Sequence, residues 1–118
     1  MQVVRQANAE TVLWDKPMTN DVKNNDGFVV CQDQRAKLSS WGNVSAASPI
    51  VVGEHLYMPT MIGMVYVIRW NAPKLDDSAL VSISDLGPAG KTWALSSLAF
   101  ADGKLYARTL KELICIGK

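Results

Sequence analysis

The amino-acid sequence predicts an all-β protein built from repeated antiparallel sheets, and three observations lead to this fold class. Helical periodicity is almost absent along the chain. Short runs rich in Val, Ile, Tyr and Leu alternate with clusters of Gly, Asn and Asp, which is the pattern of strands joined by turns. One group of these runs occurs twice, so the sheets are expected to repeat.

The apolar runs are expected to form the strands. They cover residues 11–14, 28–32, 37–41, 49–52, 55–59, 64–70, 80–83, 97–100, 104–109 and 113–116. Gly53 with Glu54, and Asp102 with Gly103, provide residues that accept positive φ between two apolar runs, as hairpin turns require. Neighbouring strands are therefore expected to be antiparallel.

The internal repeat joins residues 48–57 (SPIVVGEHLY) to residues 97–106 (SLAFADGKLY), at an offset of 49 residues. Each copy is followed by a threonine, a turn and a third apolar run. A period in the forties with three or four short strands per unit is typical of β-propeller blades. The sequence thus predicts a four-stranded sheet within residues 49–83 and an equivalent three-stranded sheet within residues 97–116.

These patterns resemble the pyrroloquinoline-quinone-type repeat of quinoprotein β-propellers, a family that includes dehydrogenases and non-enzymatic members such as the outer-membrane assembly lipoprotein. Residues 48–57, with a degenerate copy at residues 97–106, are similar to the Ser-Pro-apolar-Gly-x-x-Leu-Tyr pattern of that repeat, and residues 63–68 (GMVYVI) are similar to its third strand. Residues 31–41 (CQDQRAKLSSW) are similar to its tryptophan-docking pattern AxDxxTGKxxW. Asp33 and Trp41 match this pattern, whereas the central Thr-Gly-Lys is replaced.

The resemblance implies a single partial propeller domain over residues 1–118, with antiparallel four-stranded blades. Residues 10–41 are expected to form an outer strand and a partial blade, residues 47–84 a full blade and residues 95–117 a three-stranded blade. Asp33, Trp41 and Trp14 are implied to dock one blade on the next. Trp70 and Trp93 lie next to loops and are candidates for exposed contacts.

About two and a half blades cannot close a ring, which needs roughly four or more. The strand at residues 11–14 has no blade of its own, and the last blade has no fourth strand. We therefore expect a head-to-tail homo-oligomer of two or three chains, in which residues 11–14 of one copy complete the last blade of the next.

Candidate catalytic and metal-binding residues are few, and each has a simpler interpretation. His55 is the only histidine and follows a turn, so a solvent-exposed turn residue is expected. Asp76 and Asp77 are expected to lie in a solvated loop, and residues 24–27 (NNDG) lack the terminal Glu of a calcium loop. We expect Cys31 and Cys115 to be unbonded core residues.

The sequence favours a non-catalytic scaffold or protein-binding module that self-associates through its open edges, with no cofactor, because the quinone and metal ligands of the enzymatic family members have no match here. The alternative is a fragment of a quinone-dependent dehydrogenase whose catalytic residues lie in other blades. The net charge of +1 and the absence of a basic block disfavour nucleic acid as a partner. No apolar run is long enough to span a bilayer, and the first residues lack a signal-peptide core. The compartment stays open, although the resemblance implies an exported or periplasmic bacterial protein.

Overall fold

The computed structural model describes residues 23–35, 45–74 and 76–117. Within them, strands form two antiparallel sheets, and helix is limited to short 3-10 turns and to residues 34–35, which are α-helical, so the predicted all-β class is confirmed. The first sheet has the strand order β1 (Ile50–Val52), β2 (His55–Pro59), β3 (Met64–Arg69) and β4 (Leu80–Asp85). The second has the order β5 (Ala99–Ala101), β6 (Lys104–Arg108) and β7 (Leu113–Ile116). The 3-10 turns are η1 (Val30–Gln32) and η3 (Asp77–Ala79).

The strand pairing follows the sequence repeat. Tyr57 pairs with Ile50 in the first sheet, and Tyr106 pairs with Ala99 in the second, so corresponding residues have corresponding partners. The β5–β6 turn has positive φ at both Asp102 (51°) and Gly103 (74°), as the sequence predicts for this hairpin. No strand of one sheet pairs with a strand of the other in the described residues. The two repeats therefore fold as two separate sheets.

The turn after the second strand is closed in the same way in both repeats. The Thr60 N–H donates to the Met64 carbonyl at 2.7 Å, and the Thr109 N–H donates to the Glu112 carbonyl at 2.9 Å. Both threonine side chains are buried and also bond to their turns. Since Thr109 bonds to a residue only three positions away, the second turn is one residue shorter.

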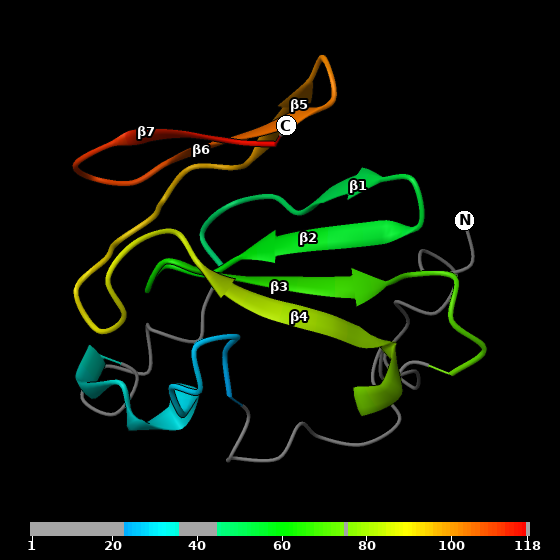
Figure 1. Ribbon diagram of the computed structural model, residues 1–118, viewed down its shortest axis with the longest axis horizontal. Helices are drawn as coiled ribbons and strands as arrows, with labels where there is room; N and C mark the ends of the chain where they lie inside the picture. The colour runs from blue at the N-terminus through cyan, green and yellow to red at the C-terminus, as the bar shows by residue number, and fades with distance from the viewer. Residues whose placement is uncertain (1–22, 36–44, 75, 118) are drawn as a thin grey trace.

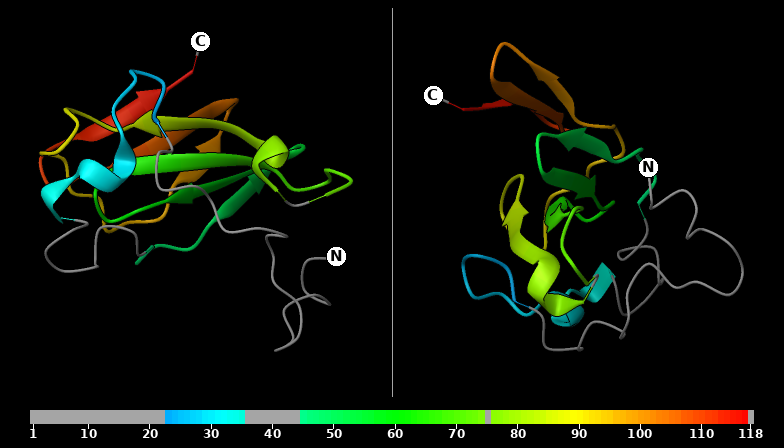
Figure 2. Two further views of the ribbon diagram at one scale, coloured as in Figure 1. Left: turned by 90° about the horizontal axis from the view of Figure 1, so that it is seen from below. Right: turned by 90° about the vertical axis from the view of Figure 1, so that its right-hand side faces the viewer.

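The chain forms three layers, which Figure 1 shows from top to bottom as the β5–β7 sheet, the β1–β4 sheet and residues 23–35. Figure 2 shows the same arrangement from two further sides. Strand β3 lies in the middle layer, and its side chains alternate between the two interfaces. Val65 and Val67 face the β5–β7 sheet and pack in one cluster with Ala107 of β6. Met64, on the other face, packs with Val30.

Residues 28–32 do not form the predicted strand. Val29 makes only an isolated bridge with Lys23, and Val30–Gln32 is the 3-10 turn η1. The Gln32 N–H donates to the Val29 carbonyl at 3.0 Å, which curls the chain back instead of extending it along a neighbour. Val30 is nevertheless buried, so the apolar run supplies the core as predicted without the strand. The strands predicted at residues 11–14 and 37–41 lie outside the described residues.

Replacing Gly63 by alanine should lower the free energy of unfolding by about 3 kcal/mol, because two costs combine. Gly63 has a φ of +79°, and a Cβ there would lie 2.7 Å from the Thr92 Cγ2 atom. Gly90 is a matched control, since its φ is +78° and no atom lies within 4 Å of its Cβ position. Gly90→Ala should cost only about 1 kcal/mol. Equal losses in urea unfolding would show that packing against Thr92 adds nothing.

Candidate functional site

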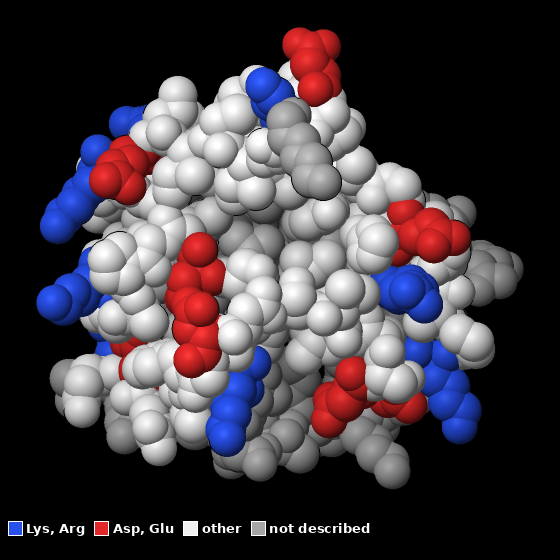
Figure 3. Space-filling model, in the orientation of Figure 1, with Lys and Arg blue, Asp and Glu red and all other residues white. Residues whose placement is uncertain are grey.

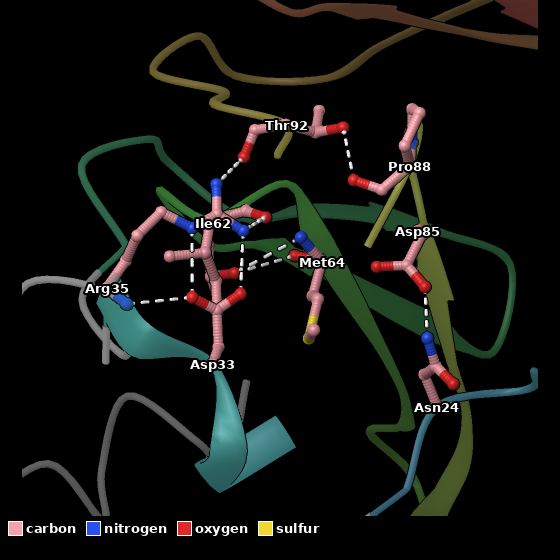
Figure 4. Close-up of polar contacts among 9 residues, drawn as sticks. Asn24, Asp33, Arg35, Ile62, Met64, Asp85, Pro88 and Thr92 are labelled. Carbon is pink, nitrogen blue, oxygen red and sulfur yellow. Dashed lines mark hydrogen bonds and ion pairs between the residues drawn. The ribbon is translucent and has the colours of Figure 1, made fainter. Parts of the chain in front are cut away.

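Asp33, one of the predicted docking residues, lies in a buried ion pair with Arg35. The Arg35 Nε and Nη2 atoms donate to the two carboxylate oxygens of Asp33 at 2.9 and 2.7 Å, and the Arg35 backbone N–H adds a third bond at 2.9 Å (Figure 4). The Arg35 side chain is 12% exposed and the Asp33 side chain is 1% exposed. These bonds from Arg35 hold the pKa of the Asp33 carboxyl below its usual value, although burial opposes the shift.

The Arg35 guanidinium also reaches two other segments of the chain. It donates to the Thr92 carbonyl and, at 3.2 Å, to the Ile62 carbonyl, and it lies 4.9 Å from the centroid of the Trp93 ring. We call these five residues, Asp33, Arg35, Ile62, Thr92 and Trp93, the Arg35 network. It joins residues 23–35 to the β2–β3 turn and to the connection between the sheets. We interpret the role of this network as structural, because the Arg35 guanidinium donates to two backbone carbonyls and a carboxylate of its own chain.

The two tryptophans predicted to make exposed contacts, Trp70 and Trp93, are half-buried in the structure. Trp93 is half-buried beneath Arg35, and Trp70 is half-buried with its indole N–H donating to the Gly53 carbonyl at 2.9 Å. Trp70 thus ties the end of β3 to the β1–β2 turn. Trp14 and Trp41 lie outside the described residues, so their docking role stays a prediction.

A second polar contact holds residues 23–28 against the end of β4. The buried Asn24 side chain donates to the Asp85 carboxylate (Figure 4). It also accepts from the Phe28 N–H at 2.7 Å. The Asn25 N–H donates to the Ile83 carbonyl at 2.8 Å. Burial raises the pKa of the Asp85 carboxyl, and the bond from Asn24 partly offsets this. The residues that resemble a calcium loop therefore form a docking turn.

The other candidate residues show ordinary structural roles. His55 is not the solvent-exposed turn residue that the sequence predicts, because it is half-buried in β2, with its ring 6.4 Å from that of Tyr57. The Asp76 carboxylate accepts from the Ser78 N–H at 2.9 Å, at the start of η3. Across residues 23–35, 45–74 and 76–117, no group of three or more His, Cys, Asp or Glu residues is placed to hold a metal ion. None of the helices in the same ranges is long and apolar enough to cross a membrane.

Cys115 corrects one prediction, because it is exposed and not part of the core, although it carries no disulfide. It lies on the face of the β5–β7 sheet that points away from the β1–β4 sheet. We call this surface the outer face. Strand register places Ala99, Ala101, Lys104, Tyr106, Arg108, Leu113 and Cys115 on it. The side chain of Cys31 is outside the described part of the structure.

The outer face is the repeat equivalent of a surface that is covered in the first sheet. By strand pairing, Leu113 corresponds to Val65 and Cys115 to Val67. Val65 is 5% exposed because the β5–β7 sheet packs on it, whereas Leu113 is 76% exposed. The second sheet therefore presents, uncovered, the face that the first sheet buries. On the face drawn in Figure 3, charged side chains of both signs lie in small groups, with no large patch of one sign among the described residues.

A groove of about 420 Å³ lies between the two sheets. Apolar side chains make up most of its lining, and the polar ones include Ser82 and Ser84 of β4. The lining residues are His55, Tyr57, Val65, Val67, Val81, Ser82, Ser84, Asp85, Leu86, Leu98, Leu105 and Ile116. Val81 and Ile116 are 49% and 46% exposed, so the groove is open to solvent where β4 faces the edge of β7.

Comparison with known proteins gives no relative: no family model, curated protein or solved structure matches the chain. The site is therefore defined by its own geometry. The sequence patterns do not single out Arg35 and Thr92 of the Arg35 network or Leu113 of the outer face. Arg35 follows Asp33 by two positions, and that spacing was the available signal for an ion pair. Leu113 had no signal, since an apolar residue in a strand is normally expected to be buried.

Proposed function

We propose that the protein is a non-catalytic scaffold, built like part of a β-propeller, that binds further copies of itself through the open end of its repeat. The observation that carries this proposal is the contrast between Val65, which is 5% exposed, and its repeat equivalent Leu113, which is 76% exposed. In the first repeat a neighbouring sheet covers this strand position, and we infer that a layer of a second copy covers Leu113 in the same way.

The packing order of the layers supports a head-to-tail partner. One face of the β1–β4 sheet packs on residues 23–35, and its other face packs on the β5–β7 sheet. The Ser48 N–H donates to the Ser97 hydroxyl at 2.9 Å, so equivalent positions of the two repeats meet at the start of β1 and β5. Both repeats thus stack in the same direction. Continuing this order puts another layer of the same kind on the outer face.

Such an interface is heterologous, because the outer face of one copy meets a different surface of the next. Heterologous contacts form a closed assembly only when the rotation between copies sums to a full turn. Two or three copies of about two and a half blades give about five to eight blades, which lies within the range of known propellers. A ring of two or three chains is therefore the assembly that we propose.

The solution mass tests this function directly. Wild-type protein should sediment as a dimer or trimer, and Leu113→Lys should shift it towards the monomer. Loss of one buried leucine removes about 2 kcal/mol per contact, so association should weaken by roughly 30-fold or more. Leu110→Lys is a matched control, because Leu110 is 67% exposed but lies in the β6–β7 turn, off the outer face. It should leave the mass unchanged.

Two outcomes would contradict the proposal. One is wild-type protein that sediments as a folded monomer at tens of micromolar. The other is equal dissociation by Leu113→Lys and Leu110→Lys, since a general effect of added charge would then explain the loss. Circular dichroism of each variant shows whether its sheets are retained.

A further inference from the structure

We propose that the cavity between residues 86–93 and the β6–β7 turn, residues 109–112, binds a small aromatic carboxylate of one or two rings. The cavity has a volume of about 280 Å³, and these two segments line it. This proposal goes beyond self-association, because Leu113 and the other residues of the outer face do not line the cavity.

Hydrogen bonds within the chain hold both walls of the cavity in place. The Leu110 N–H donates to the Trp93 carbonyl at 2.9 Å, which joins the two segments directly. In the first segment, the Thr92 hydroxyl donates to the Pro88 carbonyl at 3.0 Å (Figure 4). The site is therefore formed before a ligand enters, so little of the binding free energy is lost in ordering the protein.

The size and the apolar lining of the cavity favour an aromatic ligand. Apolar atoms make up most of the lining, and Leu86, Pro88, Trp93 and Leu110 contribute to it. The Trp93 ring is held by Arg35, whose guanidinium lies 4.9 Å from the ring centroid. Flat rings pack well against an indole and against aliphatic side chains. Because an apolar cavity of about 150 Å³ is known to bind benzene, one or two rings fit a cavity of about 280 Å³.

The charges around the cavity select a ligand with a single negative charge. Lys91 lines the cavity from the first segment and Lys111 from the second, and neither forms an ion pair with a described residue. Glu112 is the acidic residue of the lining, so two lysines and one glutamate give a net charge of +1. One carboxylate matches this charge. Because both lysines are exposed, each contributes modestly, and contact with the ring provides most of the affinity.

The test uses 2-naphthoate, which has two fused rings and one carboxylate, and 2-naphthamide as its uncharged match. Binding to the full-length protein is followed by isothermal titration calorimetry and by heteronuclear NMR. The Trp93 indole N–H resonance, assigned by its absence in Trp93→Phe, reports on the cavity itself. We expect saturable binding of 2-naphthoate with a dissociation constant below about 1 mM and a shift of this resonance. The amide should bind about fivefold more weakly.

Two pairs of lysine substitutions separate the charge of the cavity from the charge of the whole protein. Replacing both Lys91 and Lys111 by glutamine should weaken 2-naphthoate binding about fivefold and leave 2-naphthamide binding unchanged. Replacing both Lys23 and Lys74 by glutamine is the matched control, since these lysines are exposed and lie outside the lining. This control removes the same charge and should leave the binding of both ligands unchanged.

A leucine substitution tests the apolar wall of the cavity. Leu110 is 67% exposed and lines the cavity, while Leu95 is 46% exposed and lies outside the lining. Leu110→Ser should weaken the binding of both ligands about fivefold, because the ring loses an apolar contact. Leu95→Ser should leave both unchanged. Both side chains are exposed, so neither change removes a buried core residue.

Absence of saturable 2-naphthoate binding up to about 5 mM would overturn the inference. Equal weakening by the cavity pair and the control pair of lysine substitutions would overturn it too, because binding would then follow the general charge. Equal affinity for the acid and the amide would refute selection of a carboxylate. An unmoved Trp93 resonance, or equal effects of Leu110→Ser and Leu95→Ser, would show that the ligand binds elsewhere.

Discussion

Replacing Arg35 by methionine should lower the free energy of unfolding by about 3 kcal/mol, because the change leaves a buried carboxylate without its cation. Asp33 is 1% exposed at its side chain and takes two bonds from the guanidinium. The substitution also frees the Thr92 and Ile62 carbonyls that Arg35 bonds. Urea unfolding followed by circular dichroism measures the loss.

Two controls separate this effect from a general loss of charge. Arg69 is exposed at the end of β3, and Arg69→Met should change the free energy of unfolding by less than about 0.5 kcal/mol. Adding Asp33→Asn to Arg35→Met removes the unpaired charge, so the double variant should recover about 1 kcal/mol or more. A loss below about 1 kcal/mol for Arg35→Met would contradict a structural role for the network.

The stability difference should also depend on pH. Arg35 lowers the pKa of Asp33 in the folded protein, so the ion pair contributes its full stability above the unfolded value of about 4. That contribution is lost as the pH falls through the lower folded pKa. The gap between wild type and Arg35→Met should therefore be largest near pH 7 and narrow at about pH 3. A gap of constant size would show that Asp33 is not the group responsible.

The sheets could be predicted because their determinants are local. In the region from β1 to β7, each apolar run is bounded by turn residues, and the two hairpins at Gly53 and Gly103 have the positive φ that their sequences suggest. Residues 28–32 could not be predicted in the same way. Their apolar run is short, and its backbone follows the docking of Asn25 on Ile83, a contact between distant parts of the chain.

Whether a face of a sheet is buried could be predicted only where another layer of the same chain covers that face. Cys115 and Val67 occupy equivalent strand positions, and both lie in apolar runs that indicate burial. Val67 is buried because the β5–β7 sheet covers it, while Cys115 has no such layer among the described residues and is exposed. A periodic pattern shows that a face is suited to burial. It does not show whether the partner is in the same chain.

The Arg35 network could not be predicted for a related reason. Arg35 and Thr92 are 57 residues apart in the sequence. The folded chain brings both of them to the β2–β3 turn, where Arg35 also bonds to the Ile62 carbonyl. Asp33 was identified through its spacing to Trp41, but the structure pairs it with Arg35. Spacing identified the right acidic residue, and only the folded chain identifies its partner.

Deleting residues 1–15 should abolish the assembly and leave a monomer or an aggregate, because it removes the strand predicted at residues 11–14. In the proposed ring, that strand pairs with the edge of β7 in the neighbouring copy. The sequence AETVLW at residues 9–14 ends in apolar residues that suit the groove beside β7, which is lined by Val81, Leu105 and Ile116. Sedimentation velocity and light scattering measure the mass and the aggregated fraction.

Deletion of residues 1–8 is the control, since it removes about half as many residues and retains the predicted strand. It should keep the oligomeric state of the wild type, so a difference between the two deletions comes from residues 9–15, which contain the predicted strand. Without that strand the β7 edge remains unpaired, and such edges promote pairing between chains, which explains why aggregation is an expected alternative to the monomer. Wild-type mass in the protein lacking residues 1–15 would show that copies associate without this strand. Loss of the assembly in both deletions would place the determinant within the first eight residues instead.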